Sequence, residues 1–149
     1  MKTLATNKKA YFNYEILEKF EAGIVLSGIE TKAAKTGKAS LASSFAIIRN
    51  NNVSLLNCSI PPFQPKNISS VYEPERTKKL LLHKKEIEYL LGKIKEKNLT
   101  LIPLRMYTKH GLVKIELGLV KGKKKFDKRE TIKKRDVKRN IDRAKRGEI

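Results

Sequence analysis

The chain has few of the residues on which disulfides, metal sites and membrane spans depend. Its 149 residues include one cysteine, two histidines and no tryptophan. A single cysteine allows no intrachain disulfide and is typical of a reducing compartment, so we expect a cytoplasmic protein. No run approaches the roughly 18 apolar residues of a membrane helix, and the amino terminus has no apolar signal-peptide core. We therefore expect no membrane-spanning segment and no export.

Common catalytic and cofactor-binding motifs are also missing. The sequence has no G-x-x-x-x-G-K-[ST], G-x-G-x-x-G, H-E-x-x-H or G-x-S-x-G pattern. His83 and His110 have no spacing that indicates a metal site. Cys58 lies in a strand-like run, where a buried thiol is commoner than a nucleophile. We therefore expect no enzyme activity, no cofactor and no metal.

Positive charge is what the chain has in excess. Its 34 Lys and Arg outnumber 15 Asp and Glu, which gives a net charge of +19. Residues 121–149 contribute +9 and the rest contributes +10. This balance favours a nucleic-acid partner, through phosphate neutralisation and counterion release. A membrane surface is the runner-up, but no strongly amphipathic basic helix is evident, so we expect no membrane partner.

Residues 121–149 form a basic tail that is predicted not to fold alone. Its few apolar residues cannot offset the entropy of ordering the backbone. Glu130 precedes Lys134 by four positions, the favourable order for a helical ion pair. We therefore divide the chain into a domain over residues 1–120 and a tail over 121–149 that forms a helix only with a partner, for which a polyanion is the best candidate.

Hydrophobic periodicity predicts a mainly β domain. Ile87, Leu90, Leu91 and Ile94 share one helical face, which predicts a helix over 84–97. In the first half of the chain we expect an arm over 1–9, a strand over 10–26 and a short helix over 28–36 closed by Gly37. A hairpin of 44–49 and 53–60 should follow around Asn50-Asn51-Asn52. After the helix over 84–97 we expect a strand over 99–107, with Pro103 marking an edge or bulge, a turn at 109–111 and a strand over 112–120. Together they predict a small barrel with helices at its ends.

Four segments resemble the SsrA-binding protein family, also called small protein B. They are N-K-K-A at 7–10, F-E-A-G-I-V-L at 20–26, K-K-L-L-L-H-K-K-E-I at 78–87 and V-K-I-E-L-G-L-V-K-G-K-K-K-F-D-K-R at 113–129. The resemblance implies an oligonucleotide-binding-like (OB-like) β-barrel with about three helices. It also implies a monomeric adaptor that binds the tRNA-like domain of transfer-messenger RNA (tmRNA) and delivers it, with elongation factor Tu, to stalled ribosomes for trans-translation.

The same resemblance implies two sets of contact residues. The face that holds tmRNA would include Asn7, Lys8, Glu21, Leu81 and Lys114. The tail, disordered alone and helical on the ribosome, would occupy the empty mRNA channel of the small subunit. There a hinge at Gly122, Lys123 and Lys124 would precede decoding-centre contacts by Phe126, Asp127, Lys128 and Arg129, and 16S rRNA phosphate contacts by Lys133, Lys134, Arg135, Lys138 and Arg139.

The residues themselves leave alternatives open. For Glu21, a solvent-facing carboxylate is an equally good interpretation. Leu81, in an apolar run, is by default expected in the core, and Lys114 is compatible with a phosphate contact or with a surface ion pair. Many family members have His at Phe12, and His or Tyr at Phe126, so a polar role at these positions is not supported. A structural ribosomal protein with an rRNA-penetrating extension is the alternative function. A nuclease would require RNA cleavage that depends on Glu21 or on a metal.

Overall fold

The computed structural model describes residues 1–62, 72–122, 135 and 138–139. Seven strands and three helices, counted within the described residues outside the tail, make up the domain. In chain order they are β1 (Lys2–Thr6), α1 (Lys8–Asn13), β2 (Tyr14–Ile24), α2 (Gly28–Lys35), β3 (Phe45–Arg49), β4 (Asn52–Leu56), β5 (Lys78–Leu81), α3 (Lys84–Lys97), β6 (Thr100–Lys109) and β7 (Leu112–Gly122).

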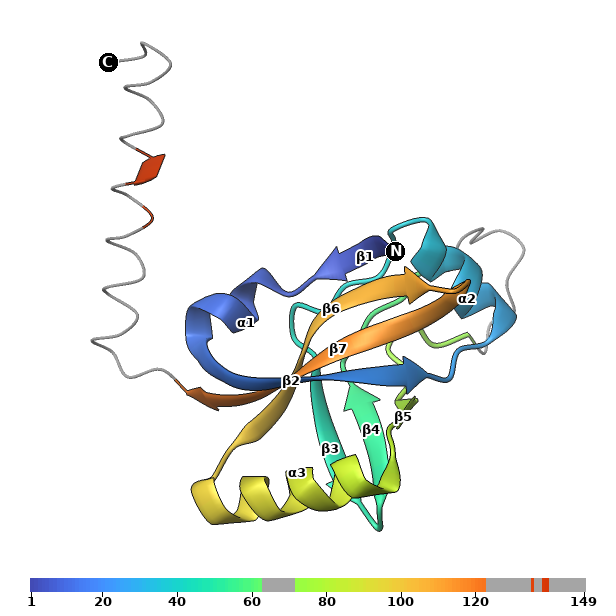
Figure 1. Cartoon of the computed structure of the whole chain (residues 1–149). Coiled ribbons are helices and arrows are strands. Elements are labelled where there is room, and N and C mark those ends of the chain that lie inside the picture. The colour runs from blue at the N-terminus through green and yellow to red at the C-terminus, as the bar shows by residue number, and fades with distance from the viewer. Residues whose placement is uncertain (63–71, 123–134, 136–137, 140–149) are drawn as a thin grey trace.

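The strands form one antiparallel sheet that closes on itself. Their order is β1-β6-β3-β4-β5-β2-β7, and β6 also pairs with β7. Six strands therefore form a ring, and β1 extends it by pairing with β6. In Figure 1, α3 lies across the end of the barrel beneath β3, β4 and β5. This confirms the predicted mainly β barrel with about three helices.

Alternating apolar residues fill the barrel because successive strand side chains point to opposite faces. Val113, Ile115, Leu117 and Leu119 of β7 are buried in the main core, as is Leu90 of α3. The predicted strand over 112–120 and helix over 84–97 are therefore confirmed, and the apolar face of each faces the same interior.

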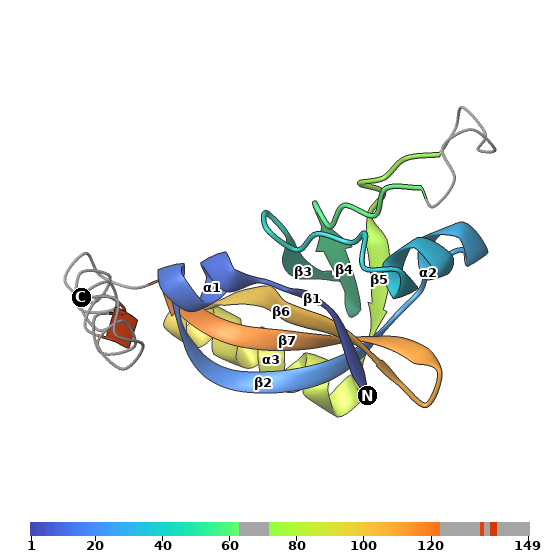
Figure 2. The same ribbon diagram turned by 90° about the horizontal axis from the view of Figure 1, so that it is seen from above.

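A smaller apolar cluster attaches α1 to the barrel. Ala10 packs with Ile102, Leu104 and Val120. Viewed from above in Figure 2, β2, β7 and β6 lie side by side, with α1 near one end of these strands and α2 near the other. The first helix thus lies beside the end of β7, where the tail begins.

The turns are made by residues that tolerate the left-handed region. Asn50 and Asn51 have φ of 51° and 61° between β3 and β4. His110 and Gly111 have φ of 52° and 77° between β6 and β7. Asparagine and glycine adopt these angles at low cost, so both predicted turns are confirmed.

Two local predictions were wrong. Residues 2–6 are not an arm but strand β1, which covers an edge of β6 that would otherwise expose unpaired backbone groups. Residues 10–13 are not strand but belong to α1, because the Asn7 side chain accepts from Ala10 N–H and starts a helix at Lys8. The prediction that Pro103 marks an edge or a bulge is confirmed for the bulge, because the pairing of β6 with β7 shifts register between Pro103 and Arg105.

A buried charge network joins α2 to the strand β5. Arg76 Nη2 lies 2.6 Å from Glu30 Oε1, and the Ser27 backbone N–H donates to the same oxygen at 2.8 Å. The Lys78 ammonium is fully buried and donates to the carbonyls of Cys58, Pro74 and Arg76. Each of these charges therefore has internal partners, as buried charges require.

Cys58 belongs to the core, as its strand-like surroundings predicted. The side chain is buried in the main apolar cluster. Burial raises the pKa of its thiol to about 11, so the thiol stays protonated and unreactive at neutral pH.

Two further properties of the described part of the chain concern membranes and metals. Among these residues, no helix combines the length and apolarity needed to cross a membrane. Nor does any group of three or more His, Cys, Asp or Glu side chains there have a metal-binding arrangement.

Candidate nucleic-acid interface

The outward side chains of four neighbouring strands form one mixed-charge surface, here called the recognition face. Register places Leu81 of β5 opposite Gly23 of β2, Gly23 opposite Lys114 of β7, and Lys114 opposite Tyr107 of β6. In an adjacent row, Glu21 lies opposite Glu116, which lies opposite Arg105. The recognition face consists of Lys19, Glu21, Gly23, Leu81, Arg105, Tyr107, Lys109, Lys114 and Glu116.

Two carboxylates that face each other across strands determine how this surface is organised. Like charges directly opposite in a sheet destabilise it, so Glu21 and Glu116 each need cationic or hydrogen-bonding partners. Glu116 binds Arg105, with Nε at 3.2 Å, and its other oxygen lies 3.8 Å from Lys19 Nζ.

Glu21 has a different pair of partners, both on β6. The Tyr107 hydroxyl donates to Glu21 Oε2 at 2.5 Å, and Lys109 Nζ lies 3.3 Å from the same oxygen. The hydrogen bond from Tyr107, assisted by Lys109 and by the charge of Lys114, holds the pKa of Glu21 below its usual range. The carboxylate is therefore ionised at neutral pH, and 41% of its side chain remains exposed.

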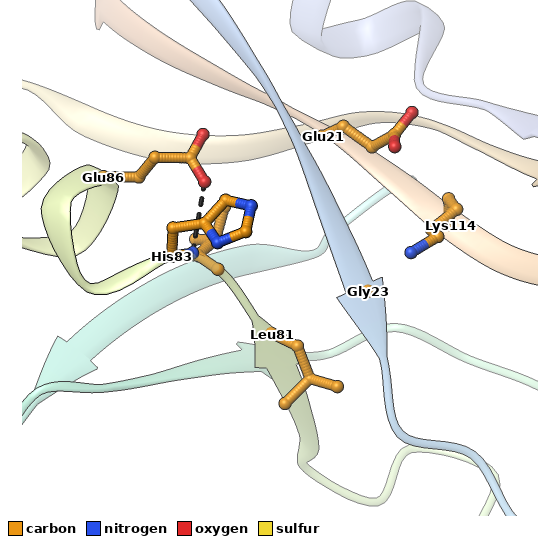
Figure 3. Close-up of a pocket in the computed structure, with 7 residues that line it drawn as sticks. Glu21, Gly23, Leu81, His83, Glu86 and Lys114 are labelled. Carbon is orange, nitrogen blue, oxygen red and sulfur yellow. Dashed lines mark hydrogen bonds between the residues drawn. The ribbon is translucent and has the colours of Figure 1, made fainter.

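A recess of about 300 Å³ opens between β2, β5, β7 and the start of α3. Figure 3 shows Lys114 on one side of β2 at Gly23, and Leu81 and His83 on the other. The lining residues are Glu21, Gly23, Leu81, Leu82, His83, Glu86 and Lys114. Such a volume lies at the lower end of the roughly 300–1,000 Å³ range of small-ligand pockets.

Glycine at position 23 keeps the recess open. A Cβ there would lie 3.3 Å from Leu81 Cβ, closer than most side chains tolerate. Leu81 itself is 52% exposed, although a leucine in an apolar run is by default expected in the core. An exposed leucine beside a lysine and a carboxylate offers an apolar surface, a cation and a hydrogen-bond acceptor within one small site.

The start of α3 forms the rim of the recess. The His83 backbone N–H donates to Glu86 Oε1 at 3.1 Å, which satisfies one of the free N–H groups of the first turn (Figure 3). Lys84 and Lys85 follow on the exposed side of the helix. The rim is thus held rigidly by the helix start.

Asn7 and Lys8 lie apart from the recess, at α1. Asn7 is only 3% exposed; its side-chain oxygen accepts from Ala10 N–H and its amide nitrogen donates to the Pro103 carbonyl at 2.9 Å. Lys8, the first residue of α1, is exposed beside a groove formed with residues 39–42. Since the Asn7 amide is engaged within the fold, the charged groups presented there are those of the exposed Lys8 and Lys9.

Gly122 is the last residue of β7. It pairs with Tyr14, the residue that follows α1. The Arg135 guanidinium carbon lies 5.0 Å from the centre of the Phe12 ring, within cation–π range. Arg135, Lys138 and Arg139 are exposed and have helical backbone. The other tail residues named above lie outside the described residues: Lys123, Lys124, Phe126, Asp127, Lys128, Arg129, Lys133 and Lys134.

The structure therefore brings Glu21, Leu81 and Lys114 together and separates them from Asn7 and Lys8. The sequence reasoning missed Tyr107, Lys109 and Gly23 of the same surface. One signal was present: Arg105, Tyr107 and Lys109 occupy alternate positions and must share a strand face. Which strand they face could not be read from that pattern, because strand order depends on the tertiary fold.

Comparison with known proteins shows which family the sequence of this chain matches. The model of the SmpB protein family matches residues 4–147. The SsrA-binding protein of Sulfurihydrogenibium sp. is 50% identical over 148 residues, which cover 99% of this chain and 97% of the relative. That of Thermosipho africanus is 53% identical over 142 residues and 95% of each chain.

A solved structure resembles the barrel as well. It is described as "tmRNA-SmpB: a journey to the center of the bacterial ribosome". Its matching chain is 44% identical and superposes with a TM-score of 0.66 over 80% of this chain and 84% of that one.

Proposed function

Because the chain belongs to the SmpB protein family, we propose that it is a non-enzymatic, RNA-binding adaptor of trans-translation. In this proposal it binds the tRNA-like domain of tmRNA and delivers it to stalled ribosomes. The observation that carries the proposal is the convergence of Glu21, Leu81 and Lys114, from three strands, on one recess.

Each side chain of the recess suits a looped RNA. Leu81 offers an exposed apolar surface on which an unstacked base can pack, Lys114 can pair with a phosphate, and Glu21 can accept from a base edge or a 2′-hydroxyl. Sequence-specific RNA binding uses such unstacked nucleotides rather than regular duplex, whose deep major groove is inaccessible to side chains.

A second contact is proposed at α1. Lys8 would reach a phosphate, whereas Asn7 would act through the helix that it caps, since its amide is already bonded to Ala10 and Pro103. The Asn7 side chain would then contribute to RNA binding by placing Lys8, without touching the RNA.

The tail is proposed to bind a different RNA. It would leave the barrel at Gly122, occupy the decoding centre and mRNA channel of the small subunit, and contact 16S rRNA. Elongation factor Tu would join through the tmRNA complex, and the adaptor would act as a cytoplasmic monomer. The proposal rests on the family membership and on the fourteen Lys and Arg between residues 121 and 149.

Binding measurements with three variants test the recess. Glu21→Gln, Leu81→Ala and Lys114→Gln are each expected to weaken tmRNA binding about tenfold, because each leaves an RNA group without its partner. Lys114→Gln should also reduce the salt dependence, with a slope smaller by about 1.

The matched control is Lys95→Gln. Lys95 is an exposed lysine in the later turns of α3, away from the helix start that borders the recess. Lys95→Gln removes the same charge as Lys114→Gln. It should change the affinity for tmRNA less than twofold, since distant surface charges contribute weakly. If all three recess variants bind like this control, the recess is not the tmRNA site.

Truncation after Gly122 tests the division of labour between barrel and tail. The truncated barrel keeps all of its described strands, so its affinity for tmRNA should fall only slightly. Peptide tagging, which needs the tail, should be lost. Loss of tmRNA binding on truncation would contradict the assignment of tmRNA to the barrel. A structural ribosomal protein would instead be recovered at one copy per subunit, whereas an adaptor is recovered substoichiometrically and with one small RNA.

A further inference from the structure

An exposed carboxylate on an RNA-binding surface needs a physical explanation. Glu21 would repel phosphate if its side chain could move freely toward the backbone of the RNA. It does not move freely, because Tyr107 donates to Oε2 at 2.5 Å and Lys109 lies within 3.4 Å of both oxygens. The carboxylate is therefore fixed in one direction and its charge is partly balanced.

The group that fixes Glu21 is itself held rigidly. Tyr107 is only 3% exposed, and the Arg105 guanidinium carbon lies 4.6 Å from the centre of its ring. Arg105 is in turn bonded to Glu116. A chain of contacts thus runs from Glu116 through Arg105 and Tyr107 to Glu21, and only its last member reaches the recess.

We propose that Tyr107 is a positioning residue that determines which nucleotide the recess accepts, an inference that rests on the proposed tmRNA site. Tyr107 holds Glu21 so that its remaining lone pairs face a base seated over Gly23 and beside Leu81, while Lys114 takes the adjoining phosphate. An ionised carboxylate only accepts hydrogen bonds. The recess therefore selects a base edge that presents neighbouring donors.

Guanine is the base that matches this requirement. Its Watson–Crick edge carries N1–H and the N2 amino group side by side, so both can donate to one carboxylate. Adenine, cytosine and uracil each place an acceptor beside their donor on that edge. Such an acceptor would face a fixed anion that cannot turn away, which is how a pinned acceptor rejects the wrong partner.

The decisive variant is Tyr107→Phe in the full-length chain, which removes one hydroxyl and keeps the buried ring. It should weaken tmRNA binding about tenfold, the effect of one hydrogen bond to a charged group. The salt slope should stay unchanged, because no phosphate contact is lost. Circular dichroism and thermal unfolding check that the variant folds.

Tyr89→Phe is the matched control. The Tyr89 hydroxyl also donates to a carboxylate of β2, that of Glu18, at 2.7 Å, but neither residue lines the recess. This control removes the same kind of hydrogen bond from the same strand, but it should bind tmRNA within about twofold of the unmodified chain, because the carboxylate that it releases lies outside the recess.

A double-substitution cycle separates positioning from a general structural effect. In the Glu21→Gln background, Tyr107→Phe should have no further effect, because there is no carboxylate left to orient. An equal loss in both backgrounds would overturn the positioning role. If Tyr107→Phe binds normally while Glu21→Gln is impaired, this inference fails and the proposed tmRNA site stands; if Glu21→Gln binds normally, the site itself fails.

Titration with mononucleotides tests the choice of base. Guanosine monophosphate should shift the NMR signals of Leu81 and Lys114 at concentrations at least about threefold lower than those that the other nucleotides require. The other nucleotides are the monophosphates of inosine, adenosine, cytidine and uridine. Inosine is the closest comparison, because its base lacks only the N2 amino group of guanine. Tyr107→Phe should abolish this preference. Equal shifts with all five nucleotides, or none with guanosine monophosphate, would overturn the selection of guanine.

Discussion

Two glutamates on this barrel, Glu21 and Glu30, have similar partners but differ in how accessible their carboxylates are. Each accepts a hydrogen bond from a neighbouring side chain and lies near a lysine. The Glu30 side chain is 2% exposed and the Glu21 side chain 41%. The partners of Glu30 stabilise the fold, whereas those of Glu21 orient a carboxylate that still has room for a ligand. Burial, and not the kind of partner, separates a carboxylate that is confined to the fold from one that stays accessible to a ligand.

The largest expected effect comes from breaking the buried member of this comparison. Glu30→Ala would leave the Lys78 ammonium, which is fully buried, without its nearby carboxylate. Removing one partner of a buried pair typically costs about 3–5 kcal/mol. Urea titration should show a loss of this order, and a loss below about 1 kcal/mol would contradict the structural role of the network.

Two glycine substitutions extend the comparison to packing. At Gly118 a Cβ would lie 3.0 Å from the side chain of Leu104, which is fully buried and cannot move away. Gly118→Ala should therefore destabilise the fold by about 1–3 kcal/mol. At Gly23 the neighbour is the half-exposed Leu81, so Gly23→Ala should cost less in thermal unfolding and should instead weaken tmRNA binding. The reverse ranking would contradict the assignment of Gly23 to the recess.

Acid should remove the contribution of the buried carboxylate of Glu30. Burial raises the pKa of Glu30, but the hydrogen bonds from Arg76 and Ser27 outweigh it and hold that pKa below its usual range. Its contribution to stability is therefore complete above about pH 4.3, the ordinary value for glutamate, and is lost as the pH falls through the depressed pKa. Glu30→Gln should flatten the fall of unfolding free energy below pH 4.3, and an unchanged slope would contradict this.

The smallest expected effect on stability is that of Glu21→Gln. Its carboxylate is exposed, so the change in unfolding free energy should stay within about 0.5 kcal/mol. The unfolding free energy and the tmRNA affinity of Glu21→Gln should be measured on the same sample. The expected result is a variant that binds tmRNA more weakly and keeps its fold. Destabilisation comparable to that of Glu30→Ala would remove the distinction between the two glutamates.

The sequence alone determined the elements whose signals are local. The helix over 84–97 follows from a period that places Ile87, Leu90 and Ile94 on one face, and the turns at Asn50 and Gly111 follow from residues that tolerate positive φ. The excess of basic residues and the family segments indicated an RNA partner. These features depend on near neighbours in the chain, which is why a sequence can specify them.

Only the tertiary structure decided the composition of the recess. Strand β1 exists because β6 offers it an edge, and α1 replaces the expected strand because Asn7 can bond to both Ala10 and Pro103. Tyr107 reaches Glu21 across β7, over 86 positions of sequence. Such contacts follow from strand order and register, which arise when the barrel closes and which no local pattern encodes.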